Sequence, residues 1–164
     1  MIVRVYRKGL RHFVLAPVLL ALSIGLLGAP GAAHAGDLIN QPFDGVAIRG
    51  YDPVAYFTDG QAVKGSNEFT YDWLGATWHF ASAEHRDLFA ADPVTYAPQY
   101  GGYCASGMVN GATASANPEN WRIVDGKLYM YSSQGAMAWW GQDAAKSIEK
   151  ADAQWELLKA DLTE

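Results

Sequence analysis

The chain has 164 residues, a formal net charge of −5, and hydrophobic residues at 50% of its positions. This length and composition are typical of one globular domain rather than of a disordered or fibrous protein. An acidic surface repels phosphate groups, which argues against nucleic acid and anionic lipid as partners. Cys104 is the only cysteine, so the chain forms no internal disulfide.

The first 35 residues have the pattern of a secretory signal peptide. Four basic residues stand before the first acidic residue, Asp37, and an apolar stretch runs from Phe13 to about Leu27. That stretch is shorter than the ~20 residues that a membrane anchor needs. Small residues at Ala33 and Ala35 favour cleavage near Ala35. We therefore expect a periplasmic or secreted domain, residues 36–164, that is not embedded in the membrane.

The mature domain is more acidic than the full chain. Removal of the leader takes four of the 12 Lys and Arg and none of the 17 Asp and Glu, which leaves a formal charge of −9. This charge strengthens the argument against nucleic acid.

The first half of the domain predicts one β-hairpin. Turn residues before it leave room only for short extended pieces at 46–48 and 54–57. Apolar and polar residues alternate over 68–73, and residues 76–80 follow a two-residue turn at Leu74-Gly75. On the second arm, Trp78 and its even-numbered neighbours share the face opposite His79.

A helix is predicted after this hairpin. Ser82 can cap a helix that ends at about Ala90, with Leu88 and Phe89 on its buried side. Asp92-Pro93 then predicts a second short turn of helix, with aspartate as the cap.

The second half predicts another hairpin and two further helices. Residues 105–118 are small and polar and indicate a loop that carries a short helix. Asp125-Gly126 is a strong hairpin signal between extended segments at 121–124 and 127–131. A short helix ends at 139–141, and a final amphipathic helix starts at about Asp143. The fold class is α+β, one domain with two β-hairpins and flanking helices, and no internal repeat is visible.

Several motifs resemble the YHS domain family. They are Asp-Pro-Val-Ala-Tyr-Phe at 52–57, Trp-His-Phe-Ala-Ser-Ala-Glu-His at 78–85 and Phe-Ala-Ala-Asp-Pro-Val-Thr-Tyr at 89–96. The continuation Tyr-Gly-Gly-Tyr-Cys-Ala at 100–105 is similar to that of exported bacterial YHS-domain proteins. Some of those relatives are selenoproteins, with selenocysteine at a position that looks like Cys104.

The resemblance implies two kinds of chemistry. YHS domains attached to heavy-metal pumps are thought to bind metal through cysteines, which implies a soft metal, copper or zinc. In this chain Ala55 and Ala81 stand at two of those positions and His85 at the third. The selenoprotein relatives imply instead a reactive sulfur at Cys104.

Cys104 therefore has three interpretations. It is a buried, inert thiol; a redox-active thiol that exchanges with an external partner; or a metal ligand. The candidate co-ligands are His85, His79 and Met108. A soft thiolate with imidazole or thioether ligands suits Cu(I) or Zn(II).

These interpretations give three functional hypotheses. The first is a soft-metal binding module centred on Cys104, which serves a metal-transfer partner protein. The second is a thiol-redox protein with a thiol partner. The third is a non-catalytic domain that holds a small apolar ligand in an aromatic pocket, and the candidate lining residues are Tyr51, Tyr56, Tyr100 and Tyr103. No signature of a classical enzyme is present in the sequence.

Overall fold

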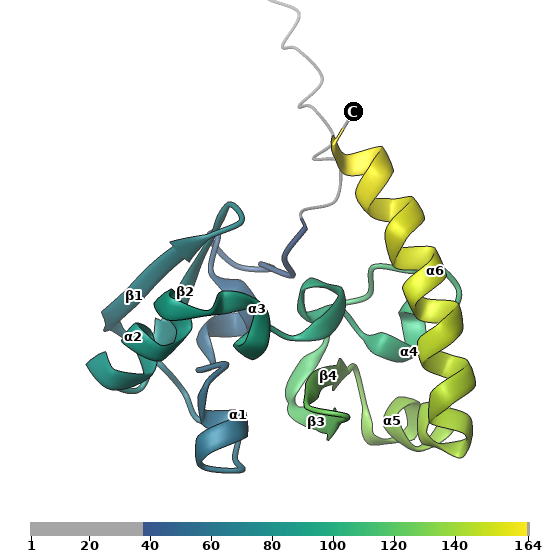
Figure 1. Ribbon diagram of the computed structural model, residues 1–164, viewed down its shortest axis with the longest axis horizontal. Coiled ribbons are helices and arrows are strands. Elements are labelled where there is room, and N and C mark those ends of the chain that lie inside the picture. The colour runs from purple at the N-terminus through teal and green to yellow at the C-terminus, as the bar shows by residue number, and fades with distance from the viewer. Residues whose placement is uncertain (1–37, 164) are drawn as a thin grey trace, which may run out of the picture. The chain divides into compact units, whose positions relative to one another are not determined.

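The computed structural model describes residues 38–163, as a small α+β domain with two antiparallel hairpins and flanking helices (Figure 1). The predicted signal peptide and its cleavage site lie outside the described residues. Among residues 38–163, no helix is both long enough and apolar enough to cross a bilayer.

The first hairpin forms as predicted. Strand β1 (Ser66–Trp73) pairs with β2 (Ala76–Phe80) around the turn at Leu74-Gly75, where both residues have positive φ. Trp78 and Phe80 are fully buried on one face of β2, because alternate side chains of a strand point to the same side.

Two helices follow this hairpin. Helix α2 (Ala83–Ala91) begins after Ser82, whose hydroxyl accepts a hydrogen bond from His85 N at 3.2 Å, and α3 (Pro93–Tyr96) follows Asp92. Phe89 is fully buried as predicted, whereas Leu88 is 37% exposed, so its predicted burial is wrong. Helix α2 places one side chain of the pair in the core and turns the other outward.

The extended pieces predicted at 46–48 and 54–57 are wrong. The 3₁₀ turn η1 (Ala47–Gly50) occupies the first, and the short helix α1 (Ala55–Thr58) occupies most of the second. The Asp52 carboxyl group accepts hydrogen bonds from the amides of Val54 and Ala55, at 2.8 and 3.4 Å. These bonds satisfy amides that a helix start leaves free, so they favour a helix over a strand.

The second hairpin is longer than predicted. Strand β3 (Asn117–Val124) begins four residues before the predicted start and pairs with β4 (Lys127–Tyr131). Asp125-Gly126 forms the turn, with φ of 50° and 74°. Before the hairpin stand the 3₁₀ turn η2 (Gln99–Gly102) and the short helix α4 (Ala105–Met108), the latter inside the predicted loop.

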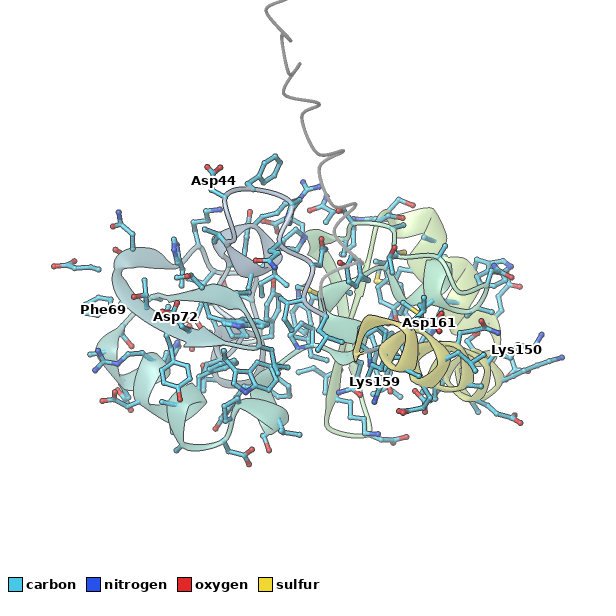
Figure 2. The ribbon with its side chains drawn as sticks, turned by 90° about the horizontal axis from the view of Figure 1, so that it is seen from above. Asp44, Phe69, Asp72, Lys150, Lys159 and Asp161 are labelled. Carbon is cyan, nitrogen blue, oxygen red and sulfur yellow. The ribbon has the colours of Figure 1, made fainter. Side chains whose placement is uncertain are left out.

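The chain ends in helices. Helix α5 (Gln134–Trp140) and the 3₁₀ turn η3 (Gly141–Asp143) lead into α6 (Ala144–Thr163), which packs against α4 (Figure 1). Ala151 is fully buried on the inner side of α6, and Lys150 extends away from the domain (Figure 2). The final amphipathic helix is therefore confirmed.

The described chain contains an internal structural repeat, contrary to the expectation from the sequence. The first repeat (residues 47–91) and the second repeat (residues 99–140) have the same element order: a 3₁₀ turn, a short helix, an eight-residue strand, a five-residue strand and a helix. Both hairpins are irregular at the same place, between the first and fifth residues of the first strand. An offset of 51 residues superposes every strand pairing of one hairpin on the other.

The cores of the repeats are built alike. In the first repeat, Phe89 of α2 packs on Trp78 and Phe80, with ring centroids 5.0 and 5.2 Å apart. In the second repeat, Trp140 of α5 packs in the same way on the two equivalent tyrosines, at 5.2 and 5.4 Å. Ser133 caps α5 as Ser82 caps α2. Equivalent positions keep their aromatic size and helix cap but rarely keep the same residue, which hides the repeat in the sequence.

Candidate functional site

Cys104 lies in the second repeat, between η2 and α4. Its amide donates a hydrogen bond of 2.8 Å to Ala114 O, and its backbone pairs with Met130 of β4. The residue is 2% exposed and belongs to the core cluster that contains Tyr131 and Trp140. The backbone thus holds the sulfur against the end of the second hairpin.

Polar groups surround the sulfur. The Ser132 amide donates a hydrogen bond to Cys104 Sγ at 3.2 Å, and Ser132 Oγ lies 3.4 Å away. Ser106 Oγ lies 3.6 Å from the sulfur and donates a hydrogen bond to Ala136 O. Ser132 itself is exposed, so the sulfur lies directly beneath a surface residue.

These contacts favour the thiolate. Burial raises the pKa of Cys104, but hydrogen bonds from Ser132 and Ser106 and from the Gly107 amide outweigh burial. The net effect is a pKa below the ordinary value of the thiol. A hydrogen bond donated to sulfur is stronger when the sulfur is charged, which is the physical cause of this direction.

In the turns ahead of the hairpins the repeats are offset by 52 residues, since η1 starts at Ala47 and η2 at Gln99. The position equivalent to Cys104 is therefore Asp52, which is fully buried. The Asp52 amide donates a hydrogen bond to Val63 O, as that of Cys104 donates to Ala114 O.

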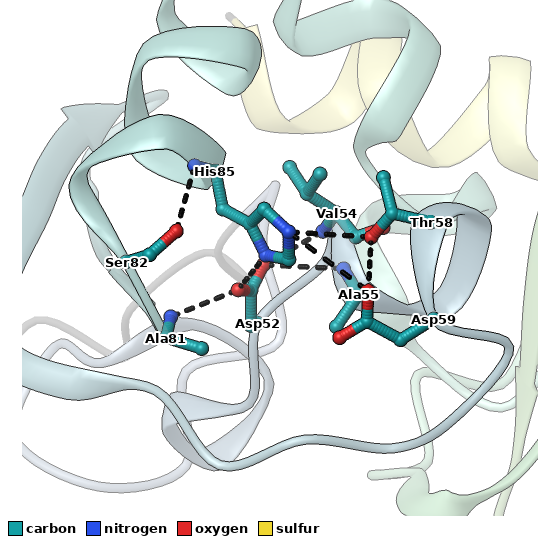
Figure 3. A network of polar contacts seen from close by, with 8 residues as sticks. All are labelled: Asp52, Val54, Ala55, Thr58, Asp59, Ala81, Ser82 and His85. Carbon is teal, nitrogen blue, oxygen red and sulfur yellow. Dashed lines mark hydrogen bonds and ion pairs between the residues drawn. The ribbon is translucent and has the colours of Figure 1, made fainter.

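Ala81, the equivalent of Ser132, donates its amide hydrogen bond to Asp52 Oδ2 at 2.8 Å, just as Ser132 donates to Cys104 (Figure 3). His85 Nδ1 lies 2.6 Å from the same carboxyl oxygen. In each repeat, backbone amides from the following short helix and hairpin therefore surround one side chain that can carry a negative charge. That side chain is Asp52 in the first repeat and Cys104 in the second.

The predicted metal ligands divide between the repeats. His85 makes its contacts within the first repeat, to Asp52 and, through Nε2, to Thr58 Oγ1 at 3.3 Å (Figure 3). His79 lies beside Gly50 and Lys64, also in the first repeat. Met108 is fully buried in the same core cluster as Cys104. Among the described residues, no three His, Cys, Asp or Glu side chains gather as a metal would require.

The four candidate tyrosines do not share one pocket. Tyr51 donates a hydrogen bond to Glu119, and Tyr56 donates to Pro118 O, both at 3.0 Å. Tyr103 belongs to the second core. Tyr100 lines a groove of about 320 Å³, whose other walls include Trp73, Val94, Pro98 and Trp155.

The segment 38–40 connects with the loop that precedes Cys104. Asn40 donates hydrogen bonds from its amide to Gly101 O at 2.8 Å and from Nδ2 to Gly102 O at 2.9 Å, and its Oδ1 accepts one from Ser115 Oγ. A β-carbon at Gly101 would lie 1.8 Å from Leu38 O, so only glycine permits this approach.

Sequence reasoning identified Cys104 but missed its partners. Ser106 and Ser132 are ordinary polar residues in the sequence, and Ser132 lies 28 positions away. Asp52 was visible only as a residue before a proline. The signal that could have found both sites is the duplicated element order, since it aligns the neighbours of Asp52 with those of Cys104.

Comparison of the chain with protein-family models, with curated proteins and with solved structures found no match.

Proposed function

We propose that this domain is an exported thiol-redox protein in which Cys104 reacts as a thiolate. The observation that carries the proposal is the hydrogen bond that the Ser132 amide donates to the sulfur, with the Ser132 hydroxyl 3.4 Å away, at a position where the other repeat holds a carboxyl group. Such bonds stabilise a charged sulfur, and the thiolate is the reactive form.

The reaction that this environment supports best is a two-electron oxidation by a peroxide. The thiolate attacks one oxygen of the O–O bond, an S–O bond forms, and the O–O bond breaks. The sulfur is oxidised to a sulfenic acid, and the peroxide is reduced to water or an alcohol after the leaving oxygen takes a proton. An external thiol then condenses with the sulfenic acid, which gives a mixed disulfide and releases water.

Burial selects the oxidant by size. The Cys104 residue is 2% exposed, while the serine above it is exposed, so a small peroxide can reach the sulfur beside Ser132. A bulky disulfide would need the loop to open. The hydroxyl of Tyr131, buried in the same cluster, has no hydrogen-bond partner among the described residues, and it offers a polar contact for a small molecule near the sulfur.

The other hypotheses stay predictions. A copper or zinc site would need ligands beyond Cys104, and the groups that contact the sulfur are serine hydroxyls and a backbone amide rather than soft ligands. An apolar ligand would find Tyr100 and its groove rather than the four tyrosines together. Membership of the YHS family and export remain part of the proposal; the motifs at 52–96 and the leader support them.

The proposal is tested with the reduced mature domain and hydrogen peroxide. We expect dimedone to label Cys104 after peroxide treatment, with the adduct located by mass spectrometry, and at a rate constant at least tenfold above that of free cysteine. Ser132→Ala keeps the amide donor and removes the hydroxyl, so it should slow the reaction. Ser147→Ala, which alters a serine that bonds Trp140 O, is the control.

A rate equal to that of free cysteine would overturn the redox proposal. Titration of the wild type and of Cys104→Ser with Cu(I) distinguishes the metal-binding hypothesis from the redox hypothesis. Tight binding that depends on Cys104, together with no labelling by dimedone, would replace the redox function with metal binding.

A further inference from the structure

A second polar site, independent of the proposed thiol chemistry, lies in the first repeat. Three basic residues, Arg49, Lys64 and His79, line one hollow of about 300 Å³. A β-carbon built on Gly50 would lie 3.2 Å from His79 Nδ1 and 3.6 Å from Lys64 Nζ. The absence of a side chain at Gly50 therefore lets two basic groups approach the same point.

This concentration of positive charge contrasts with the rest of the domain. Residues 36–164 carry eight Lys and Arg against 17 acidic residues, yet two of those eight and one of the two histidines face this hollow. Asp44 is the one acidic residue among the described lining residues. It is exposed and stands at the periphery of the domain (Figure 2).

Arg49 is held in an unusual way. Its backbone is left-handed, with φ of 56°, and its carbonyl oxygen accepts a hydrogen bond from Lys64 Nζ. Its guanidinium carbon lies 5.9 Å from the centre of the Phe43 ring. Its Nε is buried and has no hydrogen-bond acceptor among the described residues. A buried donor without an acceptor destabilises the fold, and a bound acceptor would satisfy it.

The same turn and hairpin form in the second repeat without basic side chains at the equivalent positions. The second repeat forms the same left-handed turn and hairpin, and the positions equivalent to the three basic residues are Gly101, Ser115 and Met130. A feature that one repeat has and the other lacks is explained better by a ligand than by folding.

We infer that this hollow binds the carboxylate or phosphate group of a small organic anion, through Arg49, Lys64 and His79. Arg49 Nε and Lys64 Nζ donate charge-assisted hydrogen bonds to the anion. Phe43 and Val46, which also line the hollow, contact the apolar part of the same molecule. A volume of about 300 Å³ fits a molecule of roughly ten heavy atoms, at the small end of ligand pockets.

Binding should become tighter as the pH falls below 7. Burial lowers the pKa of His79 first, and the charge of Lys64 lowers it further, so the ring is neutral in the empty hollow at pH 7. An anion beside the ring favours the imidazolium, which then adds a third positive charge to those of Arg49 and Lys64. Arg49, Lys64 and Asp44 are the charged groups that face His79 across the hollow.

The test is an NMR titration of the mature domain with benzoate, acetate and inorganic phosphate at constant ionic strength. We expect saturable shifts of the His79 ring and Arg49 Nε–H signals. Benzoate should bind more tightly than acetate if the apolar wall contributes, and the comparison of acetate with phosphate identifies the anionic group. Lys64→Gln should weaken binding about tenfold, the effect of one lost charge-assisted bond.

Matched variants make the outcome decisive. Lys127→Gln removes an exposed charge from the second hairpin and should leave the affinity unchanged. Asp44→Asn keeps a residue that tolerates positive φ and removes the opposing charge, so it should tighten binding. The absence of saturable shifts with all three probes, or equal weakening by Lys64→Gln and Lys127→Gln, would overturn the inference.

Discussion

Equivalent residues of the two repeats show how one backbone environment holds different chemistry. Asp52 and Cys104 both receive an amide hydrogen bond from the residue just after the second strand of the hairpin that follows them, at 2.8 and 3.2 Å. Asp52 also contacts His85, whose equivalent in the second repeat is Ala136. The carboxyl group is thus fully enclosed by partners, whereas the sulfur keeps a side covered only by an exposed serine.

This comparison predicts the titration of Cys104. Its pKa should lie below that of the same thiol in the urea-unfolded chain, measured from thiolate absorbance at 240 nm against pH. Ser132→Ala should raise it, because it removes the hydroxyl 3.4 Å from the sulfur. Ser147→Ala should not change it. A folded-state pKa at or above that of the unfolded chain would contradict the assignment.

The same titration affects stability. Because the folded chain holds the thiolate at a lower pH than the unfolded chain, the free energy of unfolding should rise as the pH rises from the folded pKa toward ~8.5. This gain is lost as the pH falls back through the folded pKa. Cys104→Ser should abolish this rise in the free energy of unfolding between the folded pKa and the unfolded pKa, as measured by urea denaturation at both pH values.

The site was only partly predictable at this scale. Cys104 stood out because it is the single cysteine of a chain whose leader predicts export. Its hydrogen-bond partners come from the turn before α5 and from α4, and a contact across 28 positions leaves no periodic signal. Arg49 was equally hidden, since its left-handed backbone depends on the residues packed around it.

At the scale of elements, the repeats differ in how they fill the same aromatic core. Phe80 and Phe89 carry no polar atoms, whereas the equivalent Tyr131 and Trp140 bury a hydroxyl and an indole N–H that have no partners among the described residues. Burial is the main reason that the pKa of Tyr131 is raised. The aromatic core of the second repeat therefore buries polar atoms without hydrogen-bond partners in residues 38–163, and the equivalent core residues of the first repeat do not.

Tyr131→Phe should stabilise the domain by about 1 kcal/mol, because it removes an unpaired buried hydroxyl and keeps the ring. Thermal or urea denaturation measures the change. Tyr100→Phe is the matched control, since that hydroxyl bonds Asp152 Oδ1 at 2.9 Å and its removal should destabilise the domain. A destabilised Tyr131→Phe variant would show that the hydroxyl has a partner.

Elements with local signals were predicted well. The hairpin turns at 74–75 and 125–126, the cap at Ser82 and the final helix each depend on neighbouring residues. The errors have two causes. The Asp52 side chain starts α1 through bonds that the extended pattern did not indicate, and the segment 47–50 turns against the distant strand β2. The repeat escaped notice because packing conserves size and position rather than residue identity.

At the scale of the whole domain, buried phenols make the fold sensitive to alkali. Burial is the leading cause that raises the pKa of Tyr129 to about 12, and it raises those of Tyr56 and Tyr100 further. The unfolded chain loses these protons near pH 10. Stability that is fully present below pH 10 is therefore lost as the pH rises above it.

We expect the urea midpoint of unfolding to fall steeply between pH 10 and 12. Absorbance at 295 nm should show these tyrosines ionising together with unfolding, rather than at pH 10. Exposed tyrosines should titrate earlier and without loss of structure. A midpoint that is independent of pH over this range would contradict the burial of these hydroxyls.

Asn40 links the maturation of the chain to its thiol. If the leader is removed after Ala35, Asn40 is the fifth residue of the mature protein, and its hydrogen bonds hold the glycines that precede Cys104. An aminopeptidase that removed only five residues would leave both hairpins intact but would free this loop, so trimming at one end would set the reactivity of a thiol 64 positions away.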